Sequence, residues 1–202
     1  MTHSFFPTPS NQVDEYIYQT PITGLWYIAG KRFDDERGFY AELFRTPELD
    51  RLLETPFTPK QTNLSHSKQH VIRGIHAENW NKLLTVTQGS CFAAWVDVRK
   101  ESDTYGHVIT ATLGTGENAM FGSMFVSSGI GNSFVTLSDN LDYIYTVDQL
   151  YAERDTSGDV AISVFDQALA IPWPGDRETY SISDRDRTAL TLAEWEEKTY
   201  AS

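Results

Sequence analysis

Hydrophobic and polar residues alternate along most of the chain, in short runs separated by turn-forming residues. The runs lie near residues 58–65, 69–76, 82–88, 91–98, 107–113, 118–126, 133–137, 142–149 and 159–165. Glycine-containing turns separate several of them, for example at 88–89, 114–116 and 129–131. Short runs at this spacing are typical of sandwiches and barrels, so we expect an all-β fold, an antiparallel barrel or jelly roll.

Helix signals are few. Residues 46–48 (Thr-Pro-Glu) give a side-chain cap, a proline at the first helical position and an acid in the first turn. They predict a short helix that ends before Pro56. Residues 191–194 (Thr-Leu-Ala-Glu) have the form of a capping box and predict a short helix near the C-terminus.

The beginning of the chain is less regular. Residues 22–29 and 39–44 are predicted to be strands on either side of a turn at 34–38. The first dozen residues are polar and contain two prolines, and we expect residues 1–20 to be loose or to contact a partner subunit. With 202 residues and no internal repeat, the chain is expected to form a single domain over 1–202.

The stretch from Lys60 to Leu84 is unusually rich in polar groups that can bind or react. In an ideal strand, alternation would place His76 and Arg73 on opposite faces, where they could not serve one pocket. Gly74 lies between them, and a glycine inside a strand often marks a bulge, which re-aims a side chain by half a period. A bulge at Gly74 would let Arg73 and His76 converge.

Alternation also indicates what lines the interior. It places Tyr143 and Tyr145 on one side of their strand. In residues 91–98 it favours Phe92, Ala94, Val96 and Val98 as the inner side. An apolar interior with a few polar inserts is typical of a small-molecule site.

Composition narrows the classes of function. There are 16 basic against 28 acidic residues, and the net charge of −12 disfavours binding to nucleic acid. An anionic ligand would need a local cluster such as Arg37, Arg73 and Lys82. No apolar run approaches the roughly 18 residues of a membrane span. The sequence opens without a secretory signal, and the lone Cys91 cannot build a disulfide framework, so we expect a cytoplasmic protein that binds no membrane.

Several motifs occur in an order that matches a known family. They are RGFYAELF (37–44), QTNLSHS (61–67), RGIH (73–76), NKLLTVTQG (81–89), VDVRKESDTYG (96–106), YIY (143–145) and FDQALAIPWP (165–174), followed by SISDRDR (181–187). Together they resemble the dTDP-4-dehydrorhamnose 3,5-epimerase family of cupin-like sugar-nucleotide epimerases. The resemblance spans roughly residues 20–190.

The resemblance implies a cupin-like jelly-roll homodimer with a few short helices, which moves protons beside the C4 ketone of a nucleotide-linked 4-keto-6-deoxy sugar. It implies no metal and no redox cofactor. His76 falls on the family's base, Asp166 on the carboxylate that orients it and Tyr145 on the acid. Lys82 falls on the lysine near the ketone oxygen, where enolate charge develops. A histidine suits proton abstraction near neutrality, and a tyrosine arrives protonated.

The resemblance also assigns substrate-binding positions. Arg73 matches an arginine near the sugar diphosphate, and Asn132 and Tyr151 are further candidates for substrate contact. The remaining candidates match nucleotide-contacting positions, the last three from the neighbouring subunit: Gln61, Asn63, Arg37, Tyr40 and Glu42.

Two departures from the family pattern bear on the substrate. Asn132 stands where the family usually has a histidine, and Asn cannot carry charge. The link at residues 77–80 is shorter than the family's glutamine-containing loop. A CDP- or GDP-linked sugar, a C3-only or C5-only epimerase and a non-catalytic nucleotide-sugar-binding paralogue therefore remain as alternatives. A metal-dependent cupin is disfavoured, because Asn132 occupies the position of its later histidine.

Overall fold

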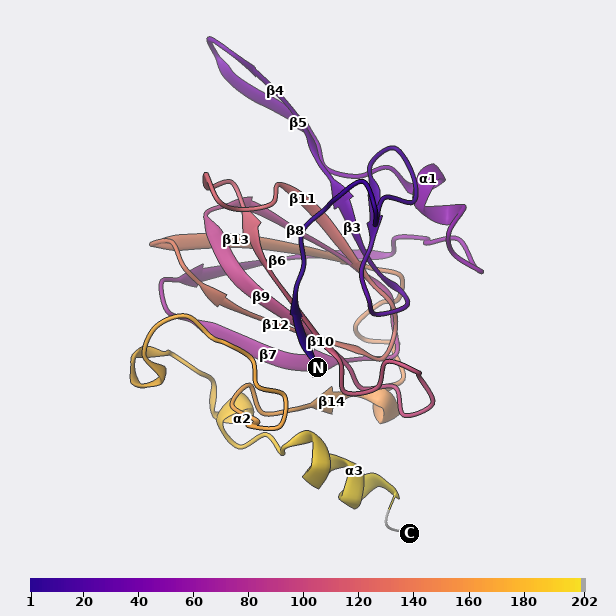
Figure 1. The fold of residues 1–202 in the computed structure, drawn as a ribbon, viewed down its shortest axis with the longest axis vertical. Coiled ribbons are helices and arrows are strands. Elements are labelled where there is room, and N and C mark those ends of the chain that lie inside the picture. Colours follow the sequence, from indigo (N-terminus) through magenta and orange to yellow (C-terminus); the bar gives the residue numbers. More distant parts are fainter. Residues whose placement is uncertain (201–202) are drawn as a thin grey trace.

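The computed structural model describes residues 1–200 as two six-stranded sheets that pack face to face (Figure 1). The first sheet has the order β1 (Thr2–Ser4), β10 (Val108–Gly114), β9 (Ser90–Asp97), β12 (Ile130–Thr136), β7 (Ile72–Ala77) and β14 (Val160–Ala161). The second has the order β2 (Ile17–Gln19), β3 (Leu25–Ala29), β11 (Gly122–Val126), β8 (Lys82–Gln88), β13 (Asn140–Val147) and β6 (Gln61–Lys68). All pairings within them are antiparallel except that of β1 with β10. The predicted all-β jelly-roll class is confirmed.

The main core lies between the sheets and includes Trp95, Leu84, Met124 and Phe134. On β9, the residues that enter this core are Cys91, Ala93 and Trp95. The choice of inner face for residues 91–98 was therefore wrong. Phe92, Ala94, Val96 and Val98 pack instead on the outer face of the first sheet, where the C-terminal segment covers them.

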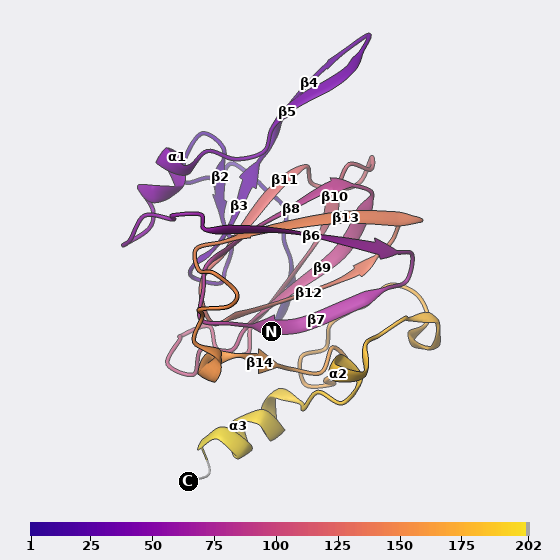
Figure 2. The same cartoon turned by 180° about the vertical axis from the view of Figure 1, so that it is seen from behind.

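The C-terminal segment crosses the outer face of the first sheet and reaches the edge formed by β7 and β14 (Figures 1 and 2). It follows β14 and contains η2 (Arg177–Thr179), α2 (Asp184–Arg187) and α3 (Leu192–Tyr200), while η1 (Thr156–Gly158) lies just before β14. Leu169, Tyr180 and Leu192 bury their side chains against this face. Burial of apolar side chains on both faces stabilises the sheet. The path of the segment places α2 beside β7.

The two predicted helices form, with different caps. At α3, Glu194 accepts hydrogen bonds from the N–H and hydroxyl of Thr191, which confirms the capping box. The helix α1 (Thr46–Asp50) covers part of the second sheet through Leu49. Its N-cap is Arg45, with no side-chain cap, so the expectation that Thr46 caps it was wrong.

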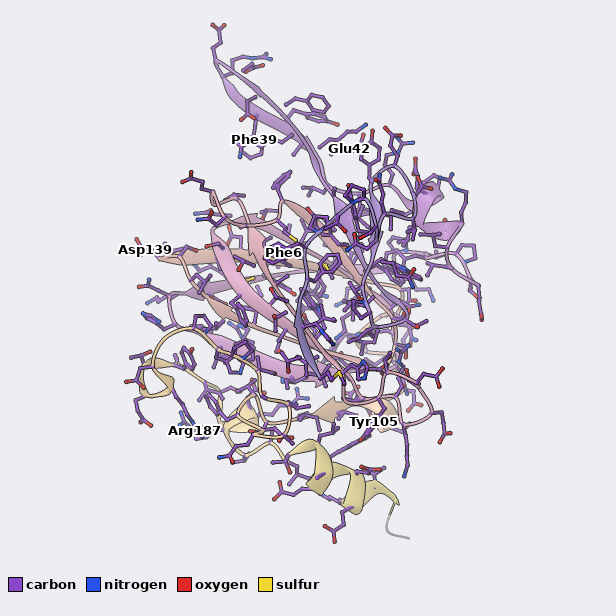
Figure 3. All side chains as sticks on the ribbon, in the orientation of Figure 1. Phe6, Phe39, Glu42, Tyr105, Asp139 and Arg187 are labelled. Carbon is purple, nitrogen blue, oxygen red and sulfur yellow. The ribbon has the colours of Figure 1, made fainter. Side chains whose placement is uncertain are left out.

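A two-stranded hairpin of β4 (Lys31–Asp35) and β5 (Gly38–Glu42) projects from the body (Figure 1). Phe39 lies along its arm and Glu42 at its base, as Figure 3 shows. The two predicted strands on either side of the turn form, as β3 and β5, but they do not pair with each other. The chain makes an additional strand, β4, that pairs with β5, while β3 pairs with β2 and β11.

The N-terminal segment is part of the fold. β1 pairs in parallel with β10, and Phe5 is buried in the main core, so this part of the chain is not loose. Among the residues that the structure describes, no helix is long and apolar enough to cross a membrane.

Candidate active site

A cavity of about 320 Å³ opens between the two sheets. One wall comes from β7 and β12 of the first sheet, and the opposite wall from β6, β8 and β13 of the second. Loops after β7 and β13 and the helix α2 complete the rim. Side chains from opposite sheets can therefore face a bound molecule from its two sides.

A bulge in β7 aims its polar side chains into this cavity. His76 is paired with Asn132 and Arg73 with Phe134, so three steps along β7 match two along β12. Gly74 has a φ of +114°, and a Cβ there would lie 2.5 Å from the Cβ of Ser133. Only glycine fits this backbone conformation without strain. Arg73 and His76 both line the cavity, which confirms the convergence predicted from Gly74.

His76 is held by a buried carboxylate. Its Nε2 lies 2.6 Å from Oδ1 of Asp186, which lies on α2, and the Asp186 side chain is only 4% exposed. Burial raises the pKa of Asp186, but the hydrogen bond and charge of His76, with further bonds from Gly74 and Ser183, lower it more, and the net pKa is lowered. An ionised carboxylate can only accept, so Nε2–H donates to it, and in the neutral form of the ring Nδ1 carries the lone pair. This arrangement gives a base of fixed tautomer.

The carboxylate expected beside His76 was Asp166, and the structure corrects this. Asp166 is buried and accepts hydrogen bonds from the backbone N–H groups of Ala168, at 2.9 Å, and Leu192, at 2.8 Å. It ties the start of α3 to the turn after β14. Its oxygens are used by the backbone, so Asp166 holds the C-terminal segment together while Asp186 contacts the imidazole.

Tyr145 faces the cavity from the opposite sheet. It lies on β13, half-buried, and lines the cavity with Tyr143, as alternation predicted. Burial raises the pKa of Tyr145; the charge of Glu78 raises it further, and Arg73 opposes this. The phenol therefore stays protonated at neutral pH and can donate a proton.

Lys82 is a buried cation at the first position of β8. Its ammonium forms an ion pair with Glu78, and Nζ also lies 3.4 Å from the carbonyl oxygen of His76. The Lys82 side chain is 7% exposed. A buried charge needs such partners. Because the side chain is buried, only a molecule that enters the cavity can contact the Lys82 ammonium.

Asn132 lies between the base and the opposite wall. It is the β12 partner of His76, and its Oδ1 accepts a hydrogen bond from the Tyr143 hydroxyl at 3.1 Å. Asn132 thus lines the cavity as predicted, in a neutral hydrogen bond with a fully buried phenol.

Aromatic and guanidinium groups form one side of the rim. The Arg154 guanidinium lies over the ring of Tyr151, 4.1 Å from its centroid, and 5.1 Å from that of Trp80. Gln61 accepts a hydrogen bond from the Tyr151 N–H and donates one to Asn63. Gln61 and Asn63 therefore lie behind the rim and do not line the cavity itself.

The three hairpin residues do not reach the cavity of their own chain. Arg37 is 85% exposed and pairs with Asp35 two residues away. Tyr40 is 69% exposed and stacks on Phe33. Neither these two nor Glu42 lines the cavity.

Sequence reasoning missed several residues of the cavity. Ser183 is a helix cap that accepts a hydrogen bond from the Asp186 N–H, but this local signal does not indicate that the Asp186 side chain reaches His76. Glu78 carried the signal of a glutamate four positions before Lys82. Other missed residues include Trp80, Arg154, Asp159 and Arg185. Within residues 1–200, no three histidine, cysteine or acidic side chains gather as a metal-ligand set.

The fold and the site together define a class. A cupin-like jelly roll with a histidine and carboxylate pair on one wall of its cavity and a tyrosine on the other has the arrangement of an enzyme that moves protons. The sequence model of the dTDP-4-dehydrorhamnose 3,5-epimerase family matches residues 19–194. The chain therefore belongs to this family of isomerases.

Individual relatives agree. The chain is 32% identical over 162 residues to dTDP-4-dehydrorhamnose 3,5-epimerase of Salmonella typhimurium, covering 78% of this chain and 85% of the relative. It is 31% identical over 177 residues to dTDP-4-dehydrorhamnose 3-epimerase of Streptomyces niveus, covering 86% and 82%. The crystal structure of NovW, a 4-keto-6-deoxy sugar epimerase of Streptomyces spheroides, superposes with a TM-score of 0.81 at 30% identity, covering 92% of this chain and 93% of that one.

A solved structure with a sugar nucleotide is also similar. The epimerase RmlC of Legionella pneumophila, in complex with dTDP-4-keto-L-rhamnose, has a TM-score of 0.77 at 32% identity, covering 88% of this chain and 92% of that chain.

Proposed function

We propose that this protein epimerises a dTDP-linked 4-keto-6-deoxy sugar at C3, C5 or both, with His76 as base and Tyr145 as acid. The observation that carries the proposal is the 2.6 Å contact between His76 and the buried Asp186, in a cavity that Tyr145 enters from the opposite sheet. A base on one face of the sugar and an acid on the other are what inversion at carbon requires.

The reaction proceeds in two proton transfers. Nδ1 of His76 removes the proton from the carbon beside the C4 ketone, and the electron pair moves to the ketone oxygen to form an enolate. The ammonium of Lys82 stabilises that oxygen, and Asp186 stabilises the imidazolium. Tyr145 then delivers its proton to the opposite face of the same carbon, and the ketone re-forms with the configuration inverted. This route uses no metal or redox cofactor.

The charged part of the substrate is drawn by a local cluster in an otherwise acidic protein. Arg73, Arg154 and Arg185 line the cavity, and guanidinium groups bind phosphate oxygens well. We assign Arg73 to the diphosphate, as the family resemblance suggests. We expect Asn132 and Tyr151 to contact the sugar and the rim side of the ligand, because both line the cavity.

We expect a second copy of the chain to complete the binding site for the nucleotide. Arg37, Tyr40 and Glu42 do not line the cavity of their own chain, although the resemblance assigns them to the ligand. A homodimer in which each hairpin reaches the partner's cavity resolves this. A cytoplasmic location stays a prediction from the sequence.

The number of inverted carbons is a separate question. The relatives include both a 3,5-epimerase and a 3-epimerase at similar identity. Asn132 also alters the pocket beside the base. C3-only or C5-only inversion, a CDP- or GDP-linked sugar, and a binding protein without catalysis are the competing outcomes of one experiment.

That experiment is proton exchange in heavy water, followed at C3 and C5 by NMR. The protein is incubated with dTDP-4-keto-6-deoxyglucose and, in parallel, with its CDP and GDP counterparts. We expect deuterium to enter C3, C5 or both, and to enter the dTDP sugar faster than the CDP and GDP sugars. The labelled positions show which carbons the enzyme inverts. Faster exchange with another nucleotide would reassign the substrate, and no exchange with any of them would overturn the proposal.

A further inference from the structure

The link after β7 places an acid inside the cavity. The Glu78 carboxylate pairs with the Lys82 ammonium, and its side chain is only 18% exposed. The Glu78 carbonyl accepts a hydrogen bond from the N–H of Gly129 at 3.1 Å and lies 3.4 Å from the Ser128 hydroxyl. The backbone that carries the carboxylate is therefore fixed on the turn between β11 and β12.

Two contacts hold the Lys82 ammonium. It forms an ion pair with the Glu78 carboxylate, and Nζ donates a hydrogen bond to the backbone carbonyl of His76, 3.4 Å away. An ammonium has three N–H donors, so this hydrogen bond leaves donors for a molecule in the cavity. Because the carbonyl belongs to His76, the ammonium is held close to the backbone that carries the base.

We propose that Glu78 is a positioning residue that aims the Lys82 ammonium at the oxygen where enolate charge develops. This inference rests on the proposed epimerase function. Glu78 does not need to touch the reacting atoms. Without Glu78, the lysine side chain could turn toward solvent or toward the phosphate of the ligand. The ion pair keeps the ammonium directed into the cavity.

The same carboxylate acts on the acid of the reaction. Its negative charge disfavours the phenolate of Tyr145, and the raised pKa of Tyr145, caused first by burial and then by Glu78, agrees with this. Arg73 on β7 acts in the opposite sense, and Tyr151 in the same sense as Glu78. The other ionisable groups that line the cavity are His76, Lys82, Tyr143, Arg154, Asp159, Arg185 and Asp186.

Two substitutions separate the effect of the negative charge from that of the polar side chain. Glu78→Gln keeps an acceptor for Lys82 and loses the charge, whereas Glu78→Ala loses both. We expect kcat to fall about tenfold in Glu78→Gln and about 100-fold in Glu78→Ala, with KM within about twofold of the wild type, because a small displacement of a catalytic group lowers the rate more than binding. In Glu78→Gln the alkaline fall of kcat moves to lower pH, since the phenol loses its proton more easily.

A matched control comes from α1. Glu48 also forms an ion pair, with Arg45, and its side chain is 15% exposed, close to the value for Glu78. Glu48→Gln makes the same change in net charge at a residue that does not line the cavity. It should leave kcat and the pH profile as in the wild type.

A second measurement does not depend on turnover. The ¹⁵N signal of the Lys82 ammonium, assigned by its loss in Lys82→Met, should be protected from exchange in the wild type and in Glu48→Gln, and should vanish in Glu78→Ala. A wild-type protein without this protected signal, or a Glu78→Ala variant that keeps both the signal and the wild-type kcat, would overturn the proposal. If the wild type exchanges no substrate protons, the epimerase function fails, and the ammonium signal still decides the role of Glu78.

Discussion

Two regions carry the polar residues that the sequence marks for substrate, the cavity between the sheets and the β4–β5 hairpin, and they are built in opposite ways. In the cavity, His76 contacts a carboxylate that is 4% exposed, and Lys82 is almost fully covered. On the hairpin, Arg37 is 85% exposed and its partner Asp35 belongs to the same turn.

The difference has a physical meaning. Polar groups that are buried and hydrogen-bonded are preorganised, and they act on charge that develops beside them without rearranging. Exposed ion pairs contribute about 0–1 kcal/mol and hold side chains loosely. The cavity is therefore preorganised for the proton transfer that we propose, whereas the exposed hairpin residues would act on a ligand or subunit that is brought to them.

The largest effect should come from the carboxylate behind the base. Asp186→Asn keeps the size of the side chain but cannot stabilise an imidazolium and no longer fixes the tautomer of His76. We expect kcat to fall roughly 10³-fold with the protein still folded, as for the carboxylate of other histidine pairs. Measurement of the epimerisation rate together with thermal unfolding checks this, and wild-type turnover in a folded variant would remove Asp186 from the mechanism.

The acid should be separable from the base. In Tyr145→Phe, His76 still removes protons, so deuterium continues to enter the substrate from heavy water. Net inversion should fall about 10²-fold because the donor on the opposite face is gone. NMR follows both quantities in one sample. In the matched variant Tyr143→Phe, which loses only a bond to Asn132, exchange and inversion should fall together. Equal loss of both in Tyr145→Phe would contradict its role as acid.

The hairpin can be tested by mixing subunits. Arg37→Ala combined with Tyr40→Ala should raise KM about 10- to 100-fold with a smaller change in kcat, because contacts to the nucleotide are lost. Arg32→Ala is the control, since Arg32 pairs with Asp34 on the same hairpin.

The hybrid dimer then gives the decisive result for this region. The double hairpin variant mixed with His76→Asn should regain activity at low substrate, because one site of each hybrid combines an intact cavity with an intact hairpin. If hybrid dimers form and activity does not return, the hairpin does not contribute to the partner's site.

The smallest effect on catalysis should come from Asp166, although it was the carboxylate favoured by the sequence. Asp166→Asn leaves one of two backbone N–H groups, those of Ala168 and Leu192, without an acceptor. We expect a loss of about 1–3 kcal/mol in the free energy of unfolding, measured in urea, and an unchanged kcat for the folded enzyme. A loss of kcat without a loss of stability would reverse the assignments of Asp166 and Asp186.

These two aspartates mark how far sequence reasoning reaches. The convergence of Arg73 and His76 could be predicted because it depends on strand period and on one glycine, which are local features. The choice between Asp166 and Asp186 depends on how the C-terminal segment crosses the first sheet and returns to β7. That path is set by packing between residues far apart in the sequence, and periodicity carries no information on it.

The strand β9 shows the same limit. Alternation predicts inner and outer faces when one face is polar, but both faces of β9 are apolar because the C-terminal segment covers the outer one. The strand was found at nearly its true bounds, and its inner face was assigned wrongly. The hairpin strand β4 was missed because its residues are exposed and charged, with no buried face to mark them.

The most direct test of the central claim, that His76 is the base of a proton-transfer site, compares wild type and His76→Asn in heavy water. Both are incubated with dTDP-4-keto-6-deoxyglucose, and deuterium at C3 and C5 is followed by NMR, with dTDP binding measured alongside. We predict that exchange falls about 10³-fold in His76→Asn while dTDP affinity and thermal unfolding stay as in the wild type. Exchange at the wild-type rate in the folded variant would show that another group removes the proton.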